Sequence, residues 1–539
     1  MKMKTQFPSL FKSIFFIGTF TLLSLLPASA AEWYVRSNAA GTNDGSSWTN
    51  AFTKLQDAID ASSSDDEIWV AGGTYLPTFV FGGASVRNRT FYIDKEIHLF
   101  GGFAGTVGTE GDFNSRDLSD NPTVLSGDIG VTGNNTDNVF HILYIDHVGN
   151  DLLIDGFIIK DGYAKDGTPL EGSGAAVLND ATNGTSSPRF INCDFDNNHS
   201  DESGGAVANW ASDGNCSSFY DNCTFTNNSA SGGGAISNVA NPNGTVNVNF
   251  VKCSFKGNAG PTAGGGAIQN IAVSNSECSS IFVNCLFSGN FSPNSGAVHT
   301  FANDGGSASP RFFNCTFAGN SSTAISTSNI GTGVCEPVLA NCIVWNNGAG
   351  TGIIDNGSTT TATFSIIPFG FPGTGNFGSD PLFVSLPDFN DAPTTAGDLH
   401  LLNGSPAIDA GDNDVLPANI TTDLEDNPRY INPNTGTSGT IDMGAYELQG
   451  FTATTDPENE PDWEIYPNPA SEDITLVFGQ PLENVVVRIY DLKGSLQIEK
   501  ALPLQASFGH IKIDALSTGM YMVQVVAEKG SSKKCWVKL

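Results

Sequence analysis

Short stretches in which every second residue is apolar alternate with Asn and Gly through the middle of the chain. The pattern recurs about every 30 residues, a period that is typical of repeat architectures. A column of cysteines marks the repeat: Cys193, Cys223, Cys253, Cys285, Cys315 and Cys342. A period of two indicates β-strands, and Asn and Gly at fixed positions indicate corners, because both residues tolerate a left-handed backbone.

Other residues keep a constant distance from these cysteines. A Phe stands two positions after each of the first five: Phe195, Phe225, Phe255, Phe287 and Phe317. An Asn stands five positions after all six: Asn198, Asn228, Asn258, Asn290, Asn320 and Asn347. A unit of this kind cannot form a core alone, and it closes its apolar faces only by stacking on copies of itself, about 4.8 Å apart.

This stacking predicts an all-β fold, a right-handed parallel β-helix, with Cys and Phe in internal ladders and Asn at the corners. We expect its repeat rungs over 136–350. Leucine-rich and ankyrin solenoids are the competing repeats, but they need helical or Leu-dominated units that are absent here. A propeller needs blades of about 40 residues.

The N-terminal part of the chain predicts export. A basic start, an apolar run over 14–26 and an Ala-x-Ala exit predict a signal peptide at 1–30. Residues 31–135 are expected to form an N-terminal cap and the first turns of the β-helix. Within them, apolar residues at helical spacing over 53–61 predict one amphipathic helix, placed to cover the open end of the solenoid.

The C-terminal part divides into three segments. Residues 351–450 are expected to form the last turns and a cap, and the polar, Pro-containing stretch 451–463 is typical of a linker. Residues 464–539 then predict a small, separate β-sandwich. After the signal peptide, no run is long and apolar enough for a transmembrane helix, which needs about 20 residues.

The charge balance narrows the partners. The chain has 24 Lys and Arg against 56 Asp and Glu, a net charge of −32. Nucleic-acid binding is disfavoured, because a phosphate backbone needs a basic face. An acidic protein also repels anionic polymers unless cations bridge the two, so neutral glycans, cations or basic surfaces fit better.

Three more cysteines, Cys216, Cys278 and Cys335, each lie seven positions before a ladder cysteine. Neither set suits a disulfide. Seven extended residues span about 20 Å or more, and in-register ladder residues lie about 4.8 Å apart, wider than the ~3.8 Å between the Cβ atoms of a disulfide. For the ladder cysteines we therefore expect buried, inert thiols that act as small hydrophobes.

The tail resembles a known family of targeting domains. Tyr466-Pro467-Asn468-Pro469, Gly519-Met520-Tyr521 and a basic ending at Lys533, Lys534 and Lys538 are similar to the type A C-terminal sorting domain of the type IX secretion system. The resemblance covers 464–539. It implies export through the periplasm, contact with the type IX secretion machinery, and a protein that is secreted or attached to the outer surface.

The body resembles two further groups. The repeat, with Phe-x-x-Asn and Gly-Gly-Ala-Ile or Gly-Gly-Ala-Val, is similar to the polymorphic outer membrane protein repeats. Segments such as 41–48, 405–411 and 441–447 resemble the choice-of-anchor Q group of pectin-lyase-like β-helices. This group implies a surface protein, mostly without an assigned reaction.

The candidate catalytic residues are Asp146 and His147. They lie in Tyr-Ile-Asp-His, which is similar to the Trp-Ile-Asp-His of pectate lyases, but the companion Arg-x-Pro-x-x-Arg segment of those enzymes is absent. A period-two strand that ends in a polar turn explains the same residues. No cofactor motif is found, and the histidines show no metal spacing.

The candidate metal ligands are Asp409, Asp412 and Asp414. Asp-x-x-Asp-x-Asp in a Gly-containing loop offers several oxygens to a structural Ca²⁺, although the ordered spacing of an EF-hand is missing. A solvated acidic loop is the alternative.

The leading hypothesis is a secreted, non-catalytic β-helix of the cell surface that binds extracellular glycans or other cell surfaces. One alternative is a polysaccharide lyase or glycoside hydrolase of pectin-lyase-like fold. Another is a structural component of a surface layer.

Overall fold

The computed structural model describes residues 30–165, 171–262, 264–348, 350–417, 420–430, 439–449, 463–483, 485–491, 496–502, 506–527 and 530–539. The predicted signal peptide 1–30 and linker 451–463 lie outside these residues, apart from one residue at the edge of each. The chain forms two compact units, which we describe separately. The larger extends to Asp426 and includes Asp442–Tyr446, and the smaller holds Asn427–Ile441 and the residues from Glu447 onward.

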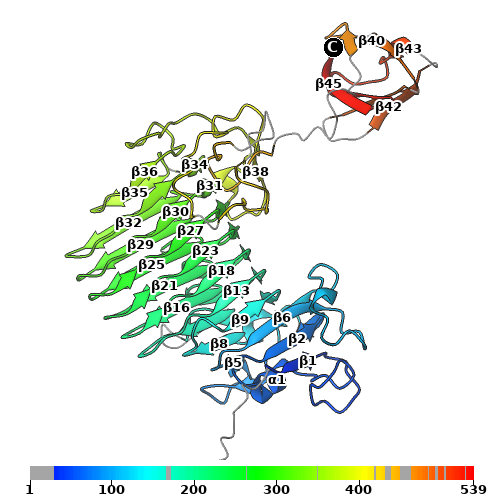
Figure 1. The fold of residues 1–539 in the computed structure, drawn as a ribbon. Helices are drawn as coiled ribbons and strands as arrows, with labels where there is room; N and C mark the ends of the chain where they lie inside the picture. Colours follow the sequence, from blue (N-terminus) through cyan, green and yellow to red (C-terminus); the bar gives the residue numbers. More distant parts are fainter. Residues whose placement is uncertain are drawn as a thin grey trace, which may run out of the picture. The chain divides into compact units, whose positions relative to one another are not determined.

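The larger unit is a parallel β-helix whose turns stack from the blue to the yellow end of the ribbon in Figure 1. Three long sheets run along it. The first consists of β1 (Glu32–Val35), β2 (Glu67–Ala71), β6 (His98–Phe103), β9 (Leu153–Asp155), β13 (Arg189–Ile191), β18 (Phe219–Asp221), β23 (Asn249–Val251), β27 (Ile281–Val283), β30 (Arg311–Phe313), β33 (Val338–Ala340) and β36 (Thr361–Thr363). The second consists of β3 (Gly73–Tyr75), β7 (Thr123–Ser126), β10 (Ile158–Lys160), β14 (Asp194–Asp196), β19 (Thr224–Thr226), β24 (Ser254–Lys256), β28 (Leu286–Ser288), β31 (Thr316–Ala318) and β34 (Ile343–Trp345).

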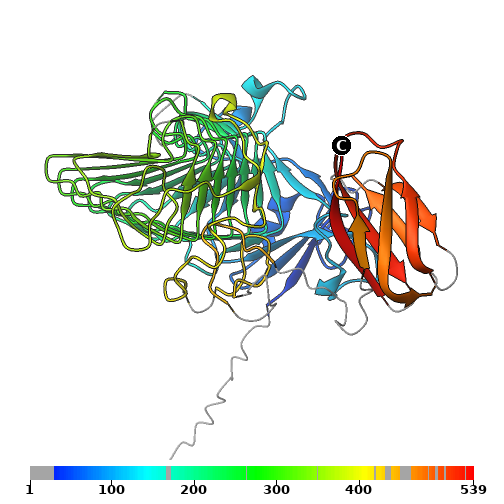
Figure 2. The same ribbon diagram turned by 90° about the horizontal axis from the view of Figure 1, so that it is seen from above.

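The third long sheet carries the candidate functional site. It consists of β4 (Phe79–Val80), β5 (Arg89–Ile93), β8 (Leu143–Asp146), β12 (Val177–Asp180), β16 (Val207–Ala211), β21 (Ile236–Ala240), β25 (Ile268–Val273), β29 (Val298–Asn303), β32 (Ile325–Ile330) and β35 (Ile353–Asn356). Two short sheets lie at corners: β11 (Tyr163–Ala164), β15 (His199–Ser203) and β20 (Ser229–Gly232), and then β17 (Asn215–Cys216), β22 (Thr245–Val246) and β26 (Glu277–Cys278). The view from above in Figure 2 shows the turns lying over one another, which confirms the predicted solenoid.

The predicted Phe ladder is present in the core. Phe195, Phe225, Phe255, Phe287 and Phe317 are buried, and successive ring centroids lie 4.6–4.8 Å apart with nearly parallel planes. A second aromatic column, from the residues three positions before each ladder cysteine, stacks at 4.8–5.1 Å in the first sheet. Parallel, in-register strands place equivalent residues of successive turns side by side, so the aromatic rings stack and fill the core between the turns.

Two columns of Asn form the predicted corners. The Asn five positions after each ladder cysteine is buried, and its amide donates to the side-chain oxygen of the next member at 2.8–3.1 Å. The residue just before each ladder cysteine has φ of 49–55°, and it is Asn in every repeat except at Lys252. Asn therefore serves in one column as an internal hydrogen-bond partner and in the other as a left-handed bend.

A third Asn column was not predicted. Asn179, Asn209, Asn238 and Asn270 point inward from the third sheet, and the amides of the first three each donate to the side-chain oxygen of the next member at 2.9–3.0 Å. The sequence signal is an Asn two positions after each Ala-Val or Ala-Ile that follows the Gly-rich corner, where a polar residue interrupts an otherwise apolar strand.

The nine cysteines of the body are buried free thiols, as expected of the ladder members. Each ladder thiol donates to a carbonyl of the preceding turn at 3.4–3.6 Å. Cys216 and Cys278 are in register with Val246 between them, so they lie two strand spacings apart. That separation is too wide for a disulfide.

Loops and one helix cover the ends of the solenoid. The predicted helix is α1 (Leu55–Ala61), which begins two residues later than expected and buries Leu55, Ala58 and Ile59. At the other end β37 (Phe383–Ser385) pairs with β38 (Asp398–Leu401), and four one-turn 3₁₀ helices occur in loops, at Val86–Asn88, Phe113–Ser115, Asn135–Asp137 and Phe389–Asp391. Carbonyls of the C-terminal loops accept hydrogen bonds from corner side chains, for example Thr422 from Asn284 at 2.7 Å.

The smaller unit contains two antiparallel sheets around a core that includes Trp463, Ile474 and Trp536. The first sheet consists of β39 (Trp463–Tyr466), β40 (Asp473–Leu482) and β43 (Ala506–Lys512), and the second of β42 (Leu496–Ala501), β41 (Val486–Tyr490), β44 (Gly519–Ala527) and β45 (Gly530–Lys538). The predicted C-terminal β-sandwich is thus present. Among the described residues, no helix has the length and apolarity needed to cross a bilayer.

Replacing Phe255 by Ala should lower the free energy of unfolding by about 3–5 kcal/mol, because it opens a cavity between two stacked rings. Phe219→Ala is the matched control: Phe219 points outward from the neighbouring sheet and is half-buried, so the expected loss is about 1 kcal/mol or less. Urea denaturation followed by circular dichroism measures both. Equal losses would contradict the internal ladder.

The ladder thiols should be unreactive while the protein is folded. Burial raises the pKa of the Cys223 and Cys253 thiols, so little thiolate forms near neutral pH. We expect iodoacetamide to leave the nine body cysteines unmodified until denaturant is added, as read by peptide mass spectrometry. Native-state labelling of Cys223 or Cys253 at the rate of a model thiol would refute this.

Candidate functional site

A hairpin lies at the N-terminal end of the third sheet and differs from the rest of the solenoid. β4 pairs with β5 in antiparallel fashion, whereas β5 pairs with β8 in parallel. Side chains alternate along β5, so Phe91 and Ile93 enter the core and Tyr92 faces outward. The hairpin therefore begins a surface that is built from outward-facing residues of successive turns.

Aromatic rings hold the hairpin on this outer face. Phe79 and Phe81 both stack on Tyr92, with centroids 5.4 and 5.1 Å away, and Phe81 also packs against Tyr144 at 4.4 Å. Each such pair contributes about 0.5–1.5 kcal/mol beyond its buried area. Phe79 remains 37% exposed, so the cluster is open to solvent on one side.

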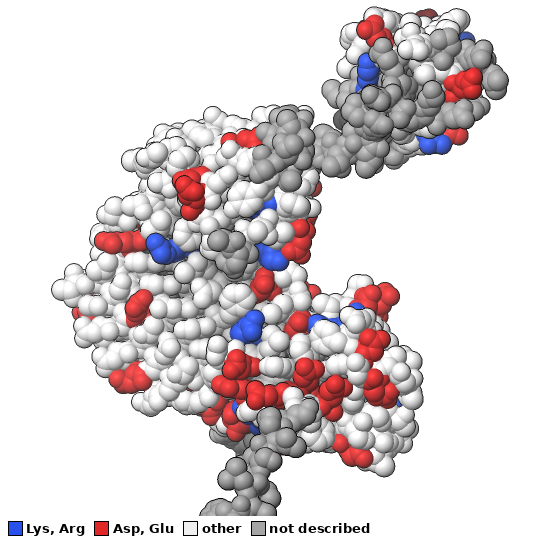
Figure 3. Space-filling model, in the orientation of Figure 1, with Lys and Arg blue, Asp and Glu red and all other residues white. Residues whose placement is uncertain are grey.

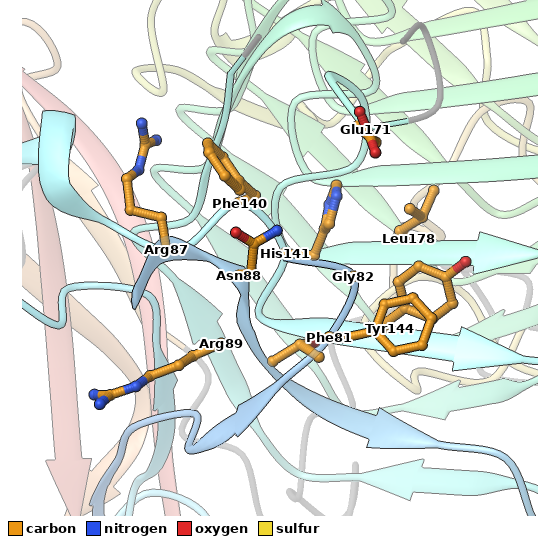
Figure 4. Close-up of a pocket in the computed structure, with 11 residues that line it drawn as sticks. Phe81, Gly82, Arg87, Asn88, Arg89, Phe140, His141, Tyr144, Glu171 and Leu178 are labelled. Atoms are coloured by element: carbon orange, nitrogen blue, oxygen red, sulfur yellow. The ribbon is translucent and has the colours of Figure 1, made fainter. Parts of the chain in front are cut away.

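A pocket of about 240 Å³ lies beside this cluster (Figure 4). Its walls combine aromatic and aliphatic side chains with a few polar ones. They are Phe81, Gly82, Arg87, Asn88, Arg89, Thr90, Phe140, His141, Tyr144, Glu171 and Leu178. A concave site with apolar walls and a few convergent polar groups is the usual form of a small-molecule site.

His141 is the polar group with the best-defined state. Its Nδ1 lies 3.0 Å from the carbonyl oxygen of Gly174, and a carbonyl can only accept, so Nδ1 carries the proton and Nε2 holds a lone pair. Burial lowers the pKa of His141 to about 4. The ring is therefore uncharged at neutral pH and presents a hydrogen-bond acceptor.

The two arginines contribute the aliphatic parts of their side chains to the pocket wall more than their charged groups. Arg87 donates to the carbonyls of Asn138 and Tyr163 at 2.6 and 2.8 Å, and its guanidinium lies 4.2 Å from the ring centroid of Phe140. Figure 4 shows the guanidinium groups of Arg87 and Arg89 extending away from His141. Among the described residues that line the pocket, no guanidinium is directed toward His141.

The predicted candidates Asp146 and His147 lie together at the end of β8, outside the lining of the pocket. The Nδ1 of His147 is hydrogen-bonded to Asp146, and its Nε2 lies 2.8 Å from the carbonyl oxygen of Thr182 in the next turn. Tyr92 donates to the other oxygen of Asp146 at 2.9 Å. His147 has φ of +55°, so the pair occupies a left-handed corner between two turns.

Acidic residues continue around this corner. Asp180 of β12 is in register with Asp146 and accepts from the hydroxyl of Tyr144 at 3.4 Å. On the face shown in Figure 3, acidic side chains gather over the N-terminal turns. The hydrogen bonds to Asp146 and Thr182 raise the pKa of His147.

The predicted calcium ligands lie in one loop that packs on a corner of the solenoid. The backbone N–H of Asp412 donates to the side chain of Asn341 at 2.8 Å, and that of Asp414 donates to the Asp412 carboxylate at 3.0 Å. The Asp409 N–H donates to Asp442 at 2.8 Å, and burial raises the pKa of Asp409. Across the described ranges, no three His, Cys, Asp or Glu side chains converge closely enough to hold a metal ion, so calcium binding stays a prediction.

The pocket itself was not predicted from the sequence. Its residues come from β5, β8, β12 and the loops between them, and no spacing in the repeat connects them. The available signal was the run Phe79-Val80-Phe81-Gly82-Gly83, an apolar strand that ends in a glycine turn before the regular repeat begins.

Comparison with known families assigns two parts of the chain. Residues 464–538 match the secretion system C-terminal sorting domain, and residues 222–239 match the Chlamydia polymorphic membrane protein repeat. These matches confirm the resemblances to the sorting domain and to the polymorphic membrane protein repeat that were inferred from the sequence. The sorting domain indicates that the protein is secreted or attached to the outer surface and that it engages the secretion machinery through this domain.

Solved structures match the chain at low similarity. Pectate lyase Pel9A is 14% identical with a TM-score of 0.38, and the match covers 78% of this chain and 97% of the lyase. Tailspike protein 2 of the Escherichia coli O157:H7 bacteriophage CAB120 is 10% identical with a TM-score of 0.27, covering 94% of this chain and 68% of the tailspike. No curated protein matches the chain.

The hydrogen bonds of His147 predict its titration. With its pKa raised, His147 should still be protonated at pH 6.5, and the stability that its pairing contributes is present below pH 6.5 and lost as the pH rises through the folded-state pKa. Asp146→Asn should lower this pKa, whereas Asp304→Asn, at an exposed corner five turns along the same sheet, should leave it unchanged. Proton NMR of the imidazole resonances measures each value. A His147 pKa below 6.5 in the unaltered protein would contradict the paired corner.

Proposed function

We propose that this secreted protein is a non-catalytic, surface-displayed β-helix that binds extracellular glycans, including those of other cells, in the pocket beside the β4–β5 hairpin. One observation carries the proposal: a pocket lined by Phe81, Phe140 and Tyr144 that also offers an uncharged His141.

The chemistry of a sugar ring suits this lining. A pyranose has an apolar face of C–H groups and a rim of hydroxyls, so it needs a flat apolar wall and a few hydrogen-bonding groups. Phe81 and Tyr144 supply the wall, and Asn88 and His141 lie on the polar side of the same pocket. Tyr144 is held in place by its contact with Phe81 and its hydrogen bond to Asp180.

The charge of the chain supports neutral glycans. A net charge of −32 repels uronate polymers, and acidic side chains gather over the N-terminal turns in Figure 3. A neutral glycan is not repelled by these charges.

The lyase and hydrolase alternative has less support. Sugar-chain cleavage by β-elimination needs a base with an available lone pair. Both ring nitrogens of His147 are engaged, one by Asp146 and one by the carbonyl of Thr182, and the pair lies outside the pocket lining. These contacts favour a structural role for the residues that resemble the lyase motif.

The test is a glycan array probed with the full mature chain, followed by calorimetry with the best-bound oligosaccharide. We expect binding without any unsaturated or shortened product. Phe81→Ala should weaken binding about tenfold, equivalent to about 1.4 kcal/mol, because it removes one wall of the pocket. Phe301→Ala is the control, since Phe301 lies on β29 of the same sheet and does not line the pocket.

Three outcomes would contradict the proposal. They are the absence of any glycan ligand, equal binding by the Phe81→Ala variant, and release of cleaved product.

A further inference from the structure

We infer that the pocket takes a single uncharged sugar ring, the end of a glycan chain, whose hydroxyl groups hydrogen-bond to Nε2 of His141 and to the side-chain amide of Asn88. The inference rests on the proposed function and names the class of ligand for that site.

The size of the pocket suits one sugar ring. Its volume is about 240 Å³, below the range of about 300–1,000 Å³ that is common for sites holding larger ligands. The hairpin turn at Gly82 and the Phe81 ring form part of its wall, and Phe81 packs against Tyr144 at 4.4 Å. A wall of this kind favours the end of a glycan chain over its middle. A terminal residue, with the rest of the chain in solvent, fits this shape.

The backbone sets which hydrogen bond His141 can make. The carbonyl of Gly174 takes the Nδ1 proton, and Gly174 is itself held by donating its N–H to the carbonyls of Ser203 and Gly204 in the next turn. Within the described part of the chain, Nε2 has no partner. A ligand hydroxyl can therefore donate to it.

Asn88 supplies the complementary group. Its amide points toward His141 in Figure 4, and among the described residues no side chain or carbonyl is bonded to it. Its backbone is fixed, because its carbonyl accepts from Phe81 at 3.0 Å and its N–H donates to Ser85 at 3.0 Å. An amide donates and accepts, so together with His141 it can satisfy two neighbouring hydroxyls.

The charges near His141 disfavour a carboxylated ring. Glu171 is the acidic group that faces it, Tyr144 packs edge-on at 6.4 Å, and the guanidinium groups of Arg87 and Arg89 extend away. A uronate in the pocket would meet the Glu171 carboxylate and a neutral imidazole, while the guanidinium groups of the two described lining arginines extend elsewhere. Burial keeps the imidazole uncharged above about pH 4.

The experiment compares neutral disaccharides of gluco, galacto and manno configuration with their uronic-acid counterparts, using saturation-transfer NMR and calorimetry on the full mature chain. We expect at least one neutral disaccharide to bind, and its uronic-acid form to bind at least tenfold more weakly at pH 7. A uronic acid that binds as tightly as its neutral form would overturn the inference.

Substitutions locate the hydrogen bonds. His141→Phe keeps a planar ring and removes the acceptor, and Asn88→Ala removes the amide; each should weaken binding at pH 7 about tenfold. His199→Phe is the control, because His199 lies on another turn and bonds Ser229. Thermal melts check that each variant folds. If His141→Phe fails to fold, the affinity of the Asn88→Ala variant tests the inference.

The pH profile separates recognition from a structural role. Wild-type affinity should be constant from pH 8 to 5.5 and fall only near pH 4, where His141 becomes protonated, whereas the His141→Phe variant should lose that fall. If Phe81→Ala abolishes binding while His141→Phe and Asn88→Ala bind like the wild type, the inference fails and the proposed function stands. If the wild type binds no glycan, both fail.

Discussion

The stacking of identical turns at one strand spacing is the constraint on which the rest of this structure depends. Backbone hydrogen bonds between parallel strands fix the distance between turns, so a side chain must tolerate its own kind about 4.8 Å above and below. Phe tolerates this as a column of parallel rings, and Asn does so as a column of amides that bond each other. Lys252 departs from the corner Asn column without harm, because its side chain points outward and reaches Asp426.

The sequence alone predicts the columns well and the pocket not at all. Cys, Phe and Asn recur at fixed offsets. A residue that stacks on the equivalent residue of the next turn must recur at the period of the repeat, and this periodicity is visible in the sequence. The column through Asn179 was missed because its strands vary in length and the repeat was aligned on the cysteines. Helix α1 was placed correctly but began two residues late, since Thr53 and Lys54 precede its first hydrogen-bonded turn.

The residues of the pocket do not recur with the period of the repeat, because the pocket forms where the repeat ends. Phe81, His141 and Leu178 lie far apart in the sequence and meet only because an antiparallel hairpin packs on a parallel sheet. Two histidines of one turn show that residue type alone does not predict the direction of a pKa shift. His141 lines the pocket, where desolvation lowers its pKa, whereas His147, six residues later, faces a carboxylate at an open corner and its pKa rises. Burial and hydrogen-bond partners, which only the fold supplies, decide between them.

The position of the pocket along the solenoid gives the intervening turns a role of their own. The pocket belongs to the first turns, whereas the chain leaves the body after Tyr446, beside the last ones, where Asp442 and Ala445 bond Asn314 and Thr316. Between the pocket and the turn of Lys252, where the C-terminal loops begin to pack on the solenoid, each turn stacks on its two neighbours, so a turn can be gained or lost there without rebuilding either end. The repeat is therefore an adjustable spacer, in which each added copy moves the pocket about 4.8 Å farther from the exit of the chain.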